Sequence, residues 1–197
     1  MSITLIIIAV TVLISIAAFR DEALINKLIL WPRYMDSPQE YYRLLTSGFI
    51  HADWNHLLFN MFSLYFMGGV VEGVLGGGIV TLYLTGIIVA SLPSFLKNRN
   101  NNHYRSLGAS GGTASILFFV IYMVPWGKLR LLFIPIPIPC IVFGVLYLLG
   151  EAYIAKRGQG NVNHDAHIWG AVYGLVYALI MDPSHGVNFV NTLMHPY

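Results

Sequence analysis

A serine and a histidine, far apart in the chain, each stand in a glycine-rich stretch of an apolar segment. Ser110 follows Gly108 and Ala109, and His167 is followed by glycines three and seven positions later. A histidine that accepts the proton of a serine hydroxyl turns that hydroxyl into a nucleophile. The two residues therefore predict acyl-transfer chemistry, provided that the fold brings them together.

Helix packing is the competing explanation, because small residues in membrane helices usually allow close contact between helices. Ser110 would, however, begin a helix, where free backbone amides and the helix dipole favour a developing oxyanion. Gly170 and Gly174 share a helical face with His167, so this face can approach another helix closely. If that helix carries Ser110, His167 comes within reach as a general base.

A second polar pair, His56 and Asn60, is spaced four residues apart and so occupies one helical face. A neutral imidazole and an amide both donate hydrogen bonds, and we expect the pair to form an oxyanion hole. The alternative is a polar pair that packs two helices together. Asp53, just before this segment, is expected to be its N-cap.

The remaining polar residues do not indicate a metal centre. His164 and His167 form an HxxH pair, but no His-Glu-x-x-His motif is present, and zinc requires three or four ligands. We therefore expect no metal and no cofactor. We also expect no carboxylate at the depth of Ser110 and His167, so a Ser–His dyad is predicted in place of a triad. The sequence does not identify the substrate-binding residues.

The composition is that of a membrane protein. Of the 197 residues, 56% are hydrophobic and only 10% are charged, with a mean hydropathy of +0.66, whereas soluble domains carry about 25% charged residues. The net charge of +2 does not favour a nucleic-acid partner, and the single cysteine, Cys140, excludes an intrachain disulfide. The first apolar run lacks the flanks of a signal peptide and is predicted to be a retained helix.

We predict an all-α, polytopic membrane protein with a single domain over residues 1–197. A spanning helix needs about 20 mostly apolar residues, and six segments qualify: 2–19, 53–72, 78–96, 109–126, 134–155 and 165–182. Three prolines move the regular start of the fifth helix to near Pro139. The connection 20–52 is expected to be a structured loop in the membrane interface, and the polar tail after Asp182 to lie outside the core.

The order of the segments predicts where the polar residues meet. The second, fourth and sixth segments run in the same direction, and His56, Ser110 and His167 each lie near the start of one of them. All three are therefore expected at a similar depth on one side of the membrane. Lys and Arg are concentrated in the odd-numbered connections, and the positive-inside rule alone would put that side in the cytoplasm.

Taken together, these motifs resemble the rhomboid family of intramembrane serine proteases, in its bacterial six-helix type. Residues 108–111 are similar to the family's GxSG nucleophile motif, residues 166–174 to its AHxxGxxxG motif, and residues 56–60 to its oxyanion-hole segment. Trp31-Pro32-Arg33 is similar to the family's Trp-Arg motif with an inserted proline. The resemblance covers nearly the whole chain.

The resemblance implies a six-helix bundle with Ser110 and His167 as the catalytic dyad and His56 and Asn60 in the oxyanion hole. It implies an endopeptidase that cleaves transmembrane segments of membrane proteins, without a cofactor, in the lipid bilayer of a bacterial inner membrane. The resemblance also places the site near the outer face of the membrane, whereas the distribution of Lys and Arg would place it on the cytoplasmic side. We follow the resemblance for the orientation.

One departure concerns the support of the histidine ring. Many bacterial members carry an aromatic residue four positions after the serine, where this chain has Ala114. We expect either that Trp169 or Tyr173 supports the ring of His167 instead, or that the ring is held less firmly. The main alternative function is a non-catalytic rhomboid-like protein that binds and escorts membrane proteins. A small transporter is a third hypothesis, and the lack of a charged residue in the middle of any helix argues against it.

Overall fold

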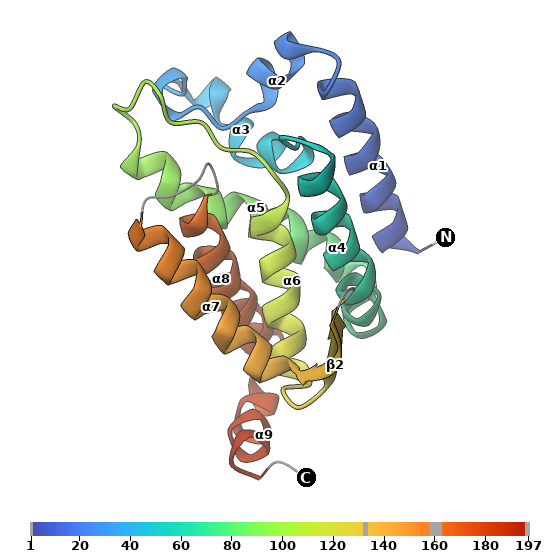
Figure 1. Ribbon diagram of the computed structural model, residues 1–197. Coiled ribbons are helices and arrows are strands. Elements are labelled where there is room, and N and C mark those ends of the chain that lie inside the picture. The colour runs from blue at the N-terminus through green and yellow to red at the C-terminus, as the bar shows by residue number, and fades with distance from the viewer. Residues whose placement is uncertain (1, 132–133, 158–162, 196–197) are drawn as a thin grey trace.

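Long helices make up most of the chain in the structure, a computed structural model that describes residues 2–131, 134–157 and 163–195 (Figure 1). Six of the helices in this described part overlap the six predicted segments: α1 (Ile3–Ala18), α4 (Trp54–Leu75), α5 (Gly78–Lys97), α6 (Ser110–Met123), α7 (Cys140–Arg157) and α8 (His164–Met181). Within the described residues, α4 and α5 are each long and apolar enough to cross a bilayer. Six crossings therefore stay a prediction.

The fifth predicted segment is only partly helical. Helix α7 begins at Cys140, directly after Pro139 as predicted, but residues 134–139 form a strand, β2 (Ile134–Pro139), antiparallel to β1 (Lys128–Leu131). The alternating prolines explain the strand, because each lacks an amide donor and disfavours the helical conformation of the residue before it. The all-α prediction therefore holds for most of the described chain, and this small hairpin is the exception.

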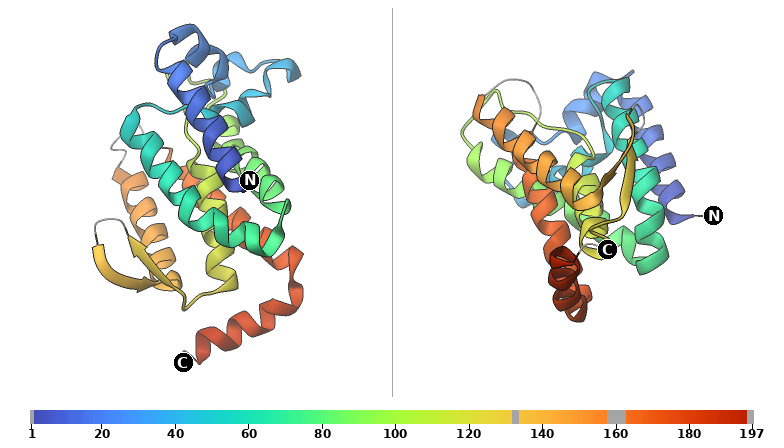
Figure 2. Two further views of the ribbon diagram at one scale, coloured as in Figure 1. Left: turned by 90° about the vertical axis from the view of Figure 1, so that its right-hand side faces the viewer. Right: turned by 60° about the horizontal axis from the view of Figure 1, so that its bottom comes forward.

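The tail after Asp182, which was predicted to lie outside the core, forms a helix that contacts the core. It forms α9 (Pro183–Met194), whose first turn is capped by the Asp182 carboxylate, 3.0 Å from the backbone nitrogen of His185. The ring of Phe189 stacks on Tyr122 of α6 at 5.2 Å, so the tail contacts the end of the central helix. Figure 2 shows that α9 and the hairpin lie at the end of the bundle opposite α2 and α3.

The long connection after α1 is structured, as predicted. It contains α2 (Glu22–Leu28), α3 (Arg43–Thr46) and three short 3-10 turns, η1 (Pro32–Tyr34), η2 (Pro38–Glu40) and η3 (Ser47–Phe49). Arg43 holds this connection together: its guanidinium donates to the carbonyls of Asn26 (2.6 Å) and Ile29 (3.1 Å) and pairs with Glu40 (2.7 Å). A charged side chain that satisfies two carbonyls and a carboxylate fixes the loop against the helix ends.

A side chain of α4 completes the start of α1. The Glu72 carboxylate accepts from the backbone nitrogens of Ile3 (2.8 Å) and Thr4 (2.9 Å), and from the hydroxyls of Ser2 (2.6 Å) and Thr4 (2.7 Å). The side chain of the N-cap residue itself, Ser2, makes no capping hydrogen bond. The first amides of α1 are thus satisfied by a carboxylate from another helix, which is also the charge that a helix N-terminus favours.

Helix α6 lies in the middle of the bundle (Figure 1). Nearly every residue between Gly111 and Tyr122 is buried. It runs parallel to both α4 and α8, because the paired contacts advance in step: His56 with Gly108, Asn60 with Thr113, Gly111 with Gly170, and Ser115 with Gly174. The predicted common direction of these three helices is confirmed.

Candidate active site

Ser110 is the first residue of α6 and lines a small cavity. Residues of the turn before it and of the start of α8 surround the same space, which is lined by Ser47, Ile87, Ser91, Ser106, Leu107, Gly108, Ser110, Gly111, Asn163 and Ala166. Gly108 has φ +118°, a conformation that side chains rarely adopt, and this turns the chain into the helix. Ser110 therefore begins a helix beside a small cavity, a position that suits a nucleophile.

The His56 ring lies against the turn that leads to Ser110. A Cβ atom at Gly108 would come within 2.6 Å of the Nε2 atom of His56, so only glycine leaves room for the imidazole there. Asp53 caps α4 by accepting from the backbone nitrogen of His56 at 2.8 Å, which confirms its predicted role. The cap fixes the helical turn from which the His56 ring extends toward Gly108.

Asn60 is buried one turn further along α4 and joins that helix to α6. Its Nδ2 atom donates to the carbonyl of His56 (2.9 Å), and its Oδ1 atom accepts from the hydroxyl of Thr113 (3.2 Å). Asn60 therefore packs α4 against α6, which is the alternative role considered for the His56–Asn60 pair. An amide nitrogen carries two hydrogens, so one donor of Asn60 is left for an oxyanion.

His51 supports the nucleophile turn, a role that the sequence did not indicate. It is fully buried; its Nδ1 atom lies 2.9 Å from the hydroxyl of Ser15, and its Nε2 atom accepts from the backbone nitrogen of Ala109 at 3.3 Å. Burial, assisted by the nearby imidazole of His56 and opposed by Asp53, lowers the pKa of His51 to about 3. The ring is therefore neutral at physiological pH and can accept the Ala109 hydrogen bond.

The start of α8 is anchored to its neighbours by Asn163. The Oδ1 atom of Asn163 accepts from the backbone nitrogen of Ala166 (3.1 Å) and from the hydroxyl of Ser94 (2.9 Å), while its Nδ2 atom donates to the hydroxyl of Ser106 (3.0 Å). An N-cap residue that also binds two other segments fixes the position of the helix end. This anchor lies one turn before His167.

Two glycines bring α8 into backbone contact with α6. A Cβ atom at Gly170 would lie 3.1 Å from the Cα atom of Gly111, and one at Gly174 would lie 2.8 Å from that of Ser115; both would come closer still to a carbonyl oxygen. The hydroxyl of Ser115 also donates to the carbonyl of Gly170 at 3.0 Å. The predicted close approach of the glycine face of α8 to the helix of Ser110 is therefore confirmed.

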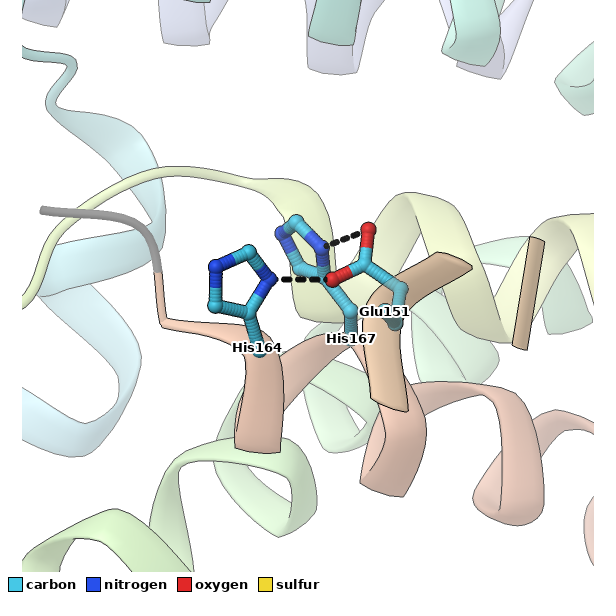
Figure 3. A group of neighbouring side chains, drawn as sticks. All are labelled: Glu151, His164 and His167. Atoms are coloured by element: carbon cyan, nitrogen blue, oxygen red, sulfur yellow. Dashed lines mark hydrogen bonds and ion pairs between the residues drawn. The ribbon is translucent and has the colours of Figure 1, made fainter. Parts of the chain in front are cut away.

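His167 does not stand without a carboxylate, and this corrects the expectation from the sequence. Its Nδ1 atom lies 2.9 Å from Oε1 of Glu151, a residue of α7 (Figure 3). The other oxygen of Glu151 lies 2.6 Å from Nδ1 of His164. The expectation failed because α7 and α8 are consecutive, antiparallel helices, so residues near the end of one stand at the depth of residues near the start of the other.

The aromatic support of His167 also comes from α7. The ring of Tyr147 stacks on the imidazole at 6.1 Å with an interplanar angle of 28°. The expectation of Trp169 or Tyr173 is wrong: Trp169 is 46% exposed, and the hydroxyl of Tyr173 bonds Thr85 of α5 at 2.6 Å. Ala114, four positions after Ser110, is buried in α6.

The structure thus brings His56, Ser110 and His167 to the first turns of three parallel helices. Within the described residues, Ser110 and His167 are not hydrogen-bonded to each other, and such bonds often tighten only when substrate binds. The arrangement offers a hydroxyl, a base, and hydrogen-bond donors around one helix N-terminus.

Comparison with known proteins supplies independent information. The Rhomboid domain family profile matches residues 38–184. The chain is 27% identical over 184 residues to "Rhomboid protease GlpG" of Haemophilus influenzae, with 90% of each chain covered. It is 31% identical over 153 residues to "Rhomboid-like protein 11, chloroplastic" of Arabidopsis thaliana, covering 72% of this chain and 52% of the relative. It is 28% identical over 151 residues to "RHOMBOID-like protein 12, mitochondrial" of the same plant, covering 68% and 44%. The chain therefore spans about half the length of these two plant relatives.

Proposed function

Because the chain belongs to the rhomboid family, whose domain covers residues 38–184, we propose that it is a serine endopeptidase that works inside the bilayer. Its substrates are transmembrane segments of other membrane proteins. The family is one of integral membrane proteins, and one relative is a rhomboid protease by name.

In the proposed reaction the hydroxyl oxygen of Ser110 attacks the carbonyl carbon of the substrate, and the Nε2 atom of His167 takes the hydroxyl proton. The carbon–nitrogen bond breaks as His167 returns this proton to the leaving amine, which leaves an acyl-enzyme. Water then attacks the acyl group by the same route, with His167 again as the base. No cofactor takes part in this sequence of steps.

The negative charge that develops on the carbonyl oxygen needs donors close to Ser110. The proposed donors are the backbone nitrogen of Ser110, the Nε2–H of His56 and the second amide hydrogen of Asn60. The position of the His56 ring against Gly108 supports its assignment. Preorganised donors of this kind contribute about 3–4 kcal/mol each to transition-state stabilisation.

The register of α6 against α8 carries the proposal. Gly111 faces Gly170, so Ser110 and His167 belong to the two first turns that pack together. Ser110 also lines a small cavity with Ala166, the residue before His167. We propose a multi-pass arrangement of six crossings; location in a bacterial inner membrane stays a prediction, since the relatives include mitochondrial and chloroplastic proteins.

The test is labelling of the detergent-solubilised protein with a fluorophosphonate probe, beside cleavage of a membrane-protein substrate in liposomes. Ser110→Ala and His167→Ala are expected to abolish both signals. The matched controls Ser63→Ala, on the exposed face of α4, and His103→Ala, in an exposed loop, are expected to retain them. Full cleavage by folded Ser110→Ala protein would refute the proposal. Binding of the substrate by folded wild-type protein without labelling or cleavage would instead favour the escort function.

A further inference from the structure

The carboxylate of Glu151 is placed between two imidazoles beside the proposed base. Its side chain is 14% exposed, and its two oxygens lie 2.9 Å from Nδ1 of His167 and 2.6 Å from Nδ1 of His164. Figure 3 shows that the carboxylate extends from α7 toward the two histidine rings of α8. Neither the dyad chemistry nor the oxyanion hole uses this group.

We propose that Glu151 is the positioning residue of His167 and completes a Ser–His–Glu triad with Ser110. This inference rests on the proposed protease function. A carboxylate at Nδ1 keeps the proton of a neutral imidazole on that nitrogen and leaves Nε2 free to take the proton of a serine, which is the logic of serine-protease triads on unrelated folds. Glu151 itself keeps no proton: the hydroxyl proton moves from Ser110 to Nε2 and then to the leaving amine.

The geometry indicates when Glu151 acts. The Nδ1 atom of His167 makes no aligned hydrogen bond, although Oε1 is only 2.9 Å away. The contact is therefore electrostatic and strengthens when His167 becomes an imidazolium, which happens in the transition state. An interaction that grows in the transition state raises the turnover rate more than it raises substrate affinity.

The other groups around Glu151 hold it in place. His164, one turn before His167 on α8, binds the second oxygen, and Tyr147, one turn before Glu151 on α7, stacks on the His167 ring. Two residues of one face of α7 thus contact the edge and the face of the same imidazole. Both contacts depend on the packing of α7 against α8, so this packing positions the imidazole of His167.

A metal ion is the other ligand that this cluster could take, since the three ligand atoms of Glu151, His164 and His167 lie within 4.8 Å of one another. A tetrahedral zinc ion at about 2.0–2.2 Å from each ligand would hold the donor atoms about 3.3 Å apart. The separations of 2.6 and 2.9 Å are instead those of charge-assisted hydrogen bonds and ion pairs. The geometry therefore favours electrostatic contacts between the carboxylate and the two imidazoles over a metal ion, and the assays are run with and without EDTA to exclude a metal effect.

The experiment compares wild type, Glu151→Gln and Glu151→Asp, with Asp165→Asn as the matched control. Asp165 is a carboxylate of the same helix turn as His167 that pairs with Lys97, so its loss removes a nearby charge without touching the imidazole. Fluorophosphonate labelling rates and kcat and KM for cleavage are measured from pH 5 to 9, with thermal unfolding as the folding control. The titratable groups around His167 are Glu151, Tyr147, His164 and His56. Of these, the experiment changes only Glu151.

For Glu151→Gln we expect kcat at pH 7 to fall about 100-fold or more with little change in KM, and the acid limb of the pH profile to move about one unit lower. Glu151→Asp is expected to recover most of the rate, and Asp165→Asn to match wild type. A folded Glu151→Gln protein with a wild-type rate and pH profile would overturn the inference while the protease function stands. Wild type that neither labels nor cleaves would overturn both.

A second measurement does not depend on the stability of the Glu151→Gln protein. In the Ser110→Ala background, the ring nitrogens of His167 are assigned by ¹⁵N NMR through their absence in His167→Gln. We expect the proton on Nδ1. A neutral His167 with its proton on Nε2 would overturn the positioning role, whatever the activity of the variants.

Discussion

Replacement of Gly174 by alanine tests the contact on which the active-site geometry depends. The new Cβ atom would lie 2.8 Å from the C and Cα atoms of Ser115 and closer still to its carbonyl oxygen, whereas ordinary contacts begin near 3.4 Å. Backbone atoms have no rotamer to escape into, so α8 must move away from α6 by about 0.6 Å at least, and by about 1 Å to clear the oxygen.

The free-energy cost has two parts. Overpacking of this kind costs about 1–3 kcal/mol, and the hydrogen bond from Ser115 to the carbonyl of Gly170 contributes about 1 kcal/mol. A loss of about 2–4 kcal/mol corresponds to a fall in Tm of about 5–15 °C for a chain of this size. A displacement of about 1 Å also misplaces His167, two turns away, and is expected to lower the cleavage rate about 100-fold.

The matched control is Gly150→Ala on α7, where a new Cβ atom meets nothing within 4 Å. Alanine is the better helix former by about 0.5–1 kcal/mol, so this variant keeps or raises the Tm. Thermal unfolding in detergent and initial rates of substrate cleavage are measured for both variants. Equal Tm and rate in Gly174→Ala and Gly150→Ala would refute the role assigned to the α6–α8 contact. Ser115→Gly should not rescue Gly174→Ala, because the clash is with the backbone.

Three further changes have defined outcomes. The free energy of unfolding should fall by up to about 1.4 kcal/mol per pH unit below pH 6.5, because His51 takes up a proton in the unfolded chain but, with its pKa lowered to about 3, does not do so in the folded protein. Thermal unfolding from pH 4.5 to 8 measures this slope. The slope should shrink in His51→Gln, and an unchanged slope would contradict the assignment. Tyr147→Ala should lower the cleavage rate by up to tenfold, since ring stacking is worth about 0.5–1.5 kcal/mol, while Tyr147→Phe keeps the wild-type rate; equal rates in both would exclude a role for the ring. Asp53→Ala should cost about 1 kcal/mol of stability through loss of the α4 cap, and Asp53→Asn should cost much less, as judged by Tm.

The helices and their directions can be predicted from the sequence, because each helix is encoded by its own apolar segment. An apolar run long enough to reach across a bilayer predicts its helix, and alternate helices share a direction, so the common level of His56, Ser110 and His167 needs only the segment boundaries. The start of α7 at Cys140 was likewise predicted, from the stiffness of Pro139.

The residues that the sequence did not predict all depend on contacts between segments. The partners of His51 lie 36 and 58 positions away, in α1 and in the turn before α6. Glu151 meets His167 only because α7 and α8 are antiparallel, and its depth is set by where α7 ends, which the hydropathy of the run does not fix. The support of His167 by Tyr147, in place of Trp169, depends on which face of α7 packs against α8.

The four hydrogen bonds of Glu72 to the start of α1 have a consequence for biosynthesis. Glu72 follows the residues that it caps by 68–70 positions in the sequence. At about 5–20 residues per second, a ribosome needs roughly 4–14 s to add that length of chain. Until then the first amides of α1 have no carboxylate, and water has to satisfy these donors. The N-terminal end of α1 must therefore remain hydrated while the intervening loop is made. The pairing of α1 with α4 is then an early step of cotranslational assembly, before the helices that carry Ser110 and His167 exist.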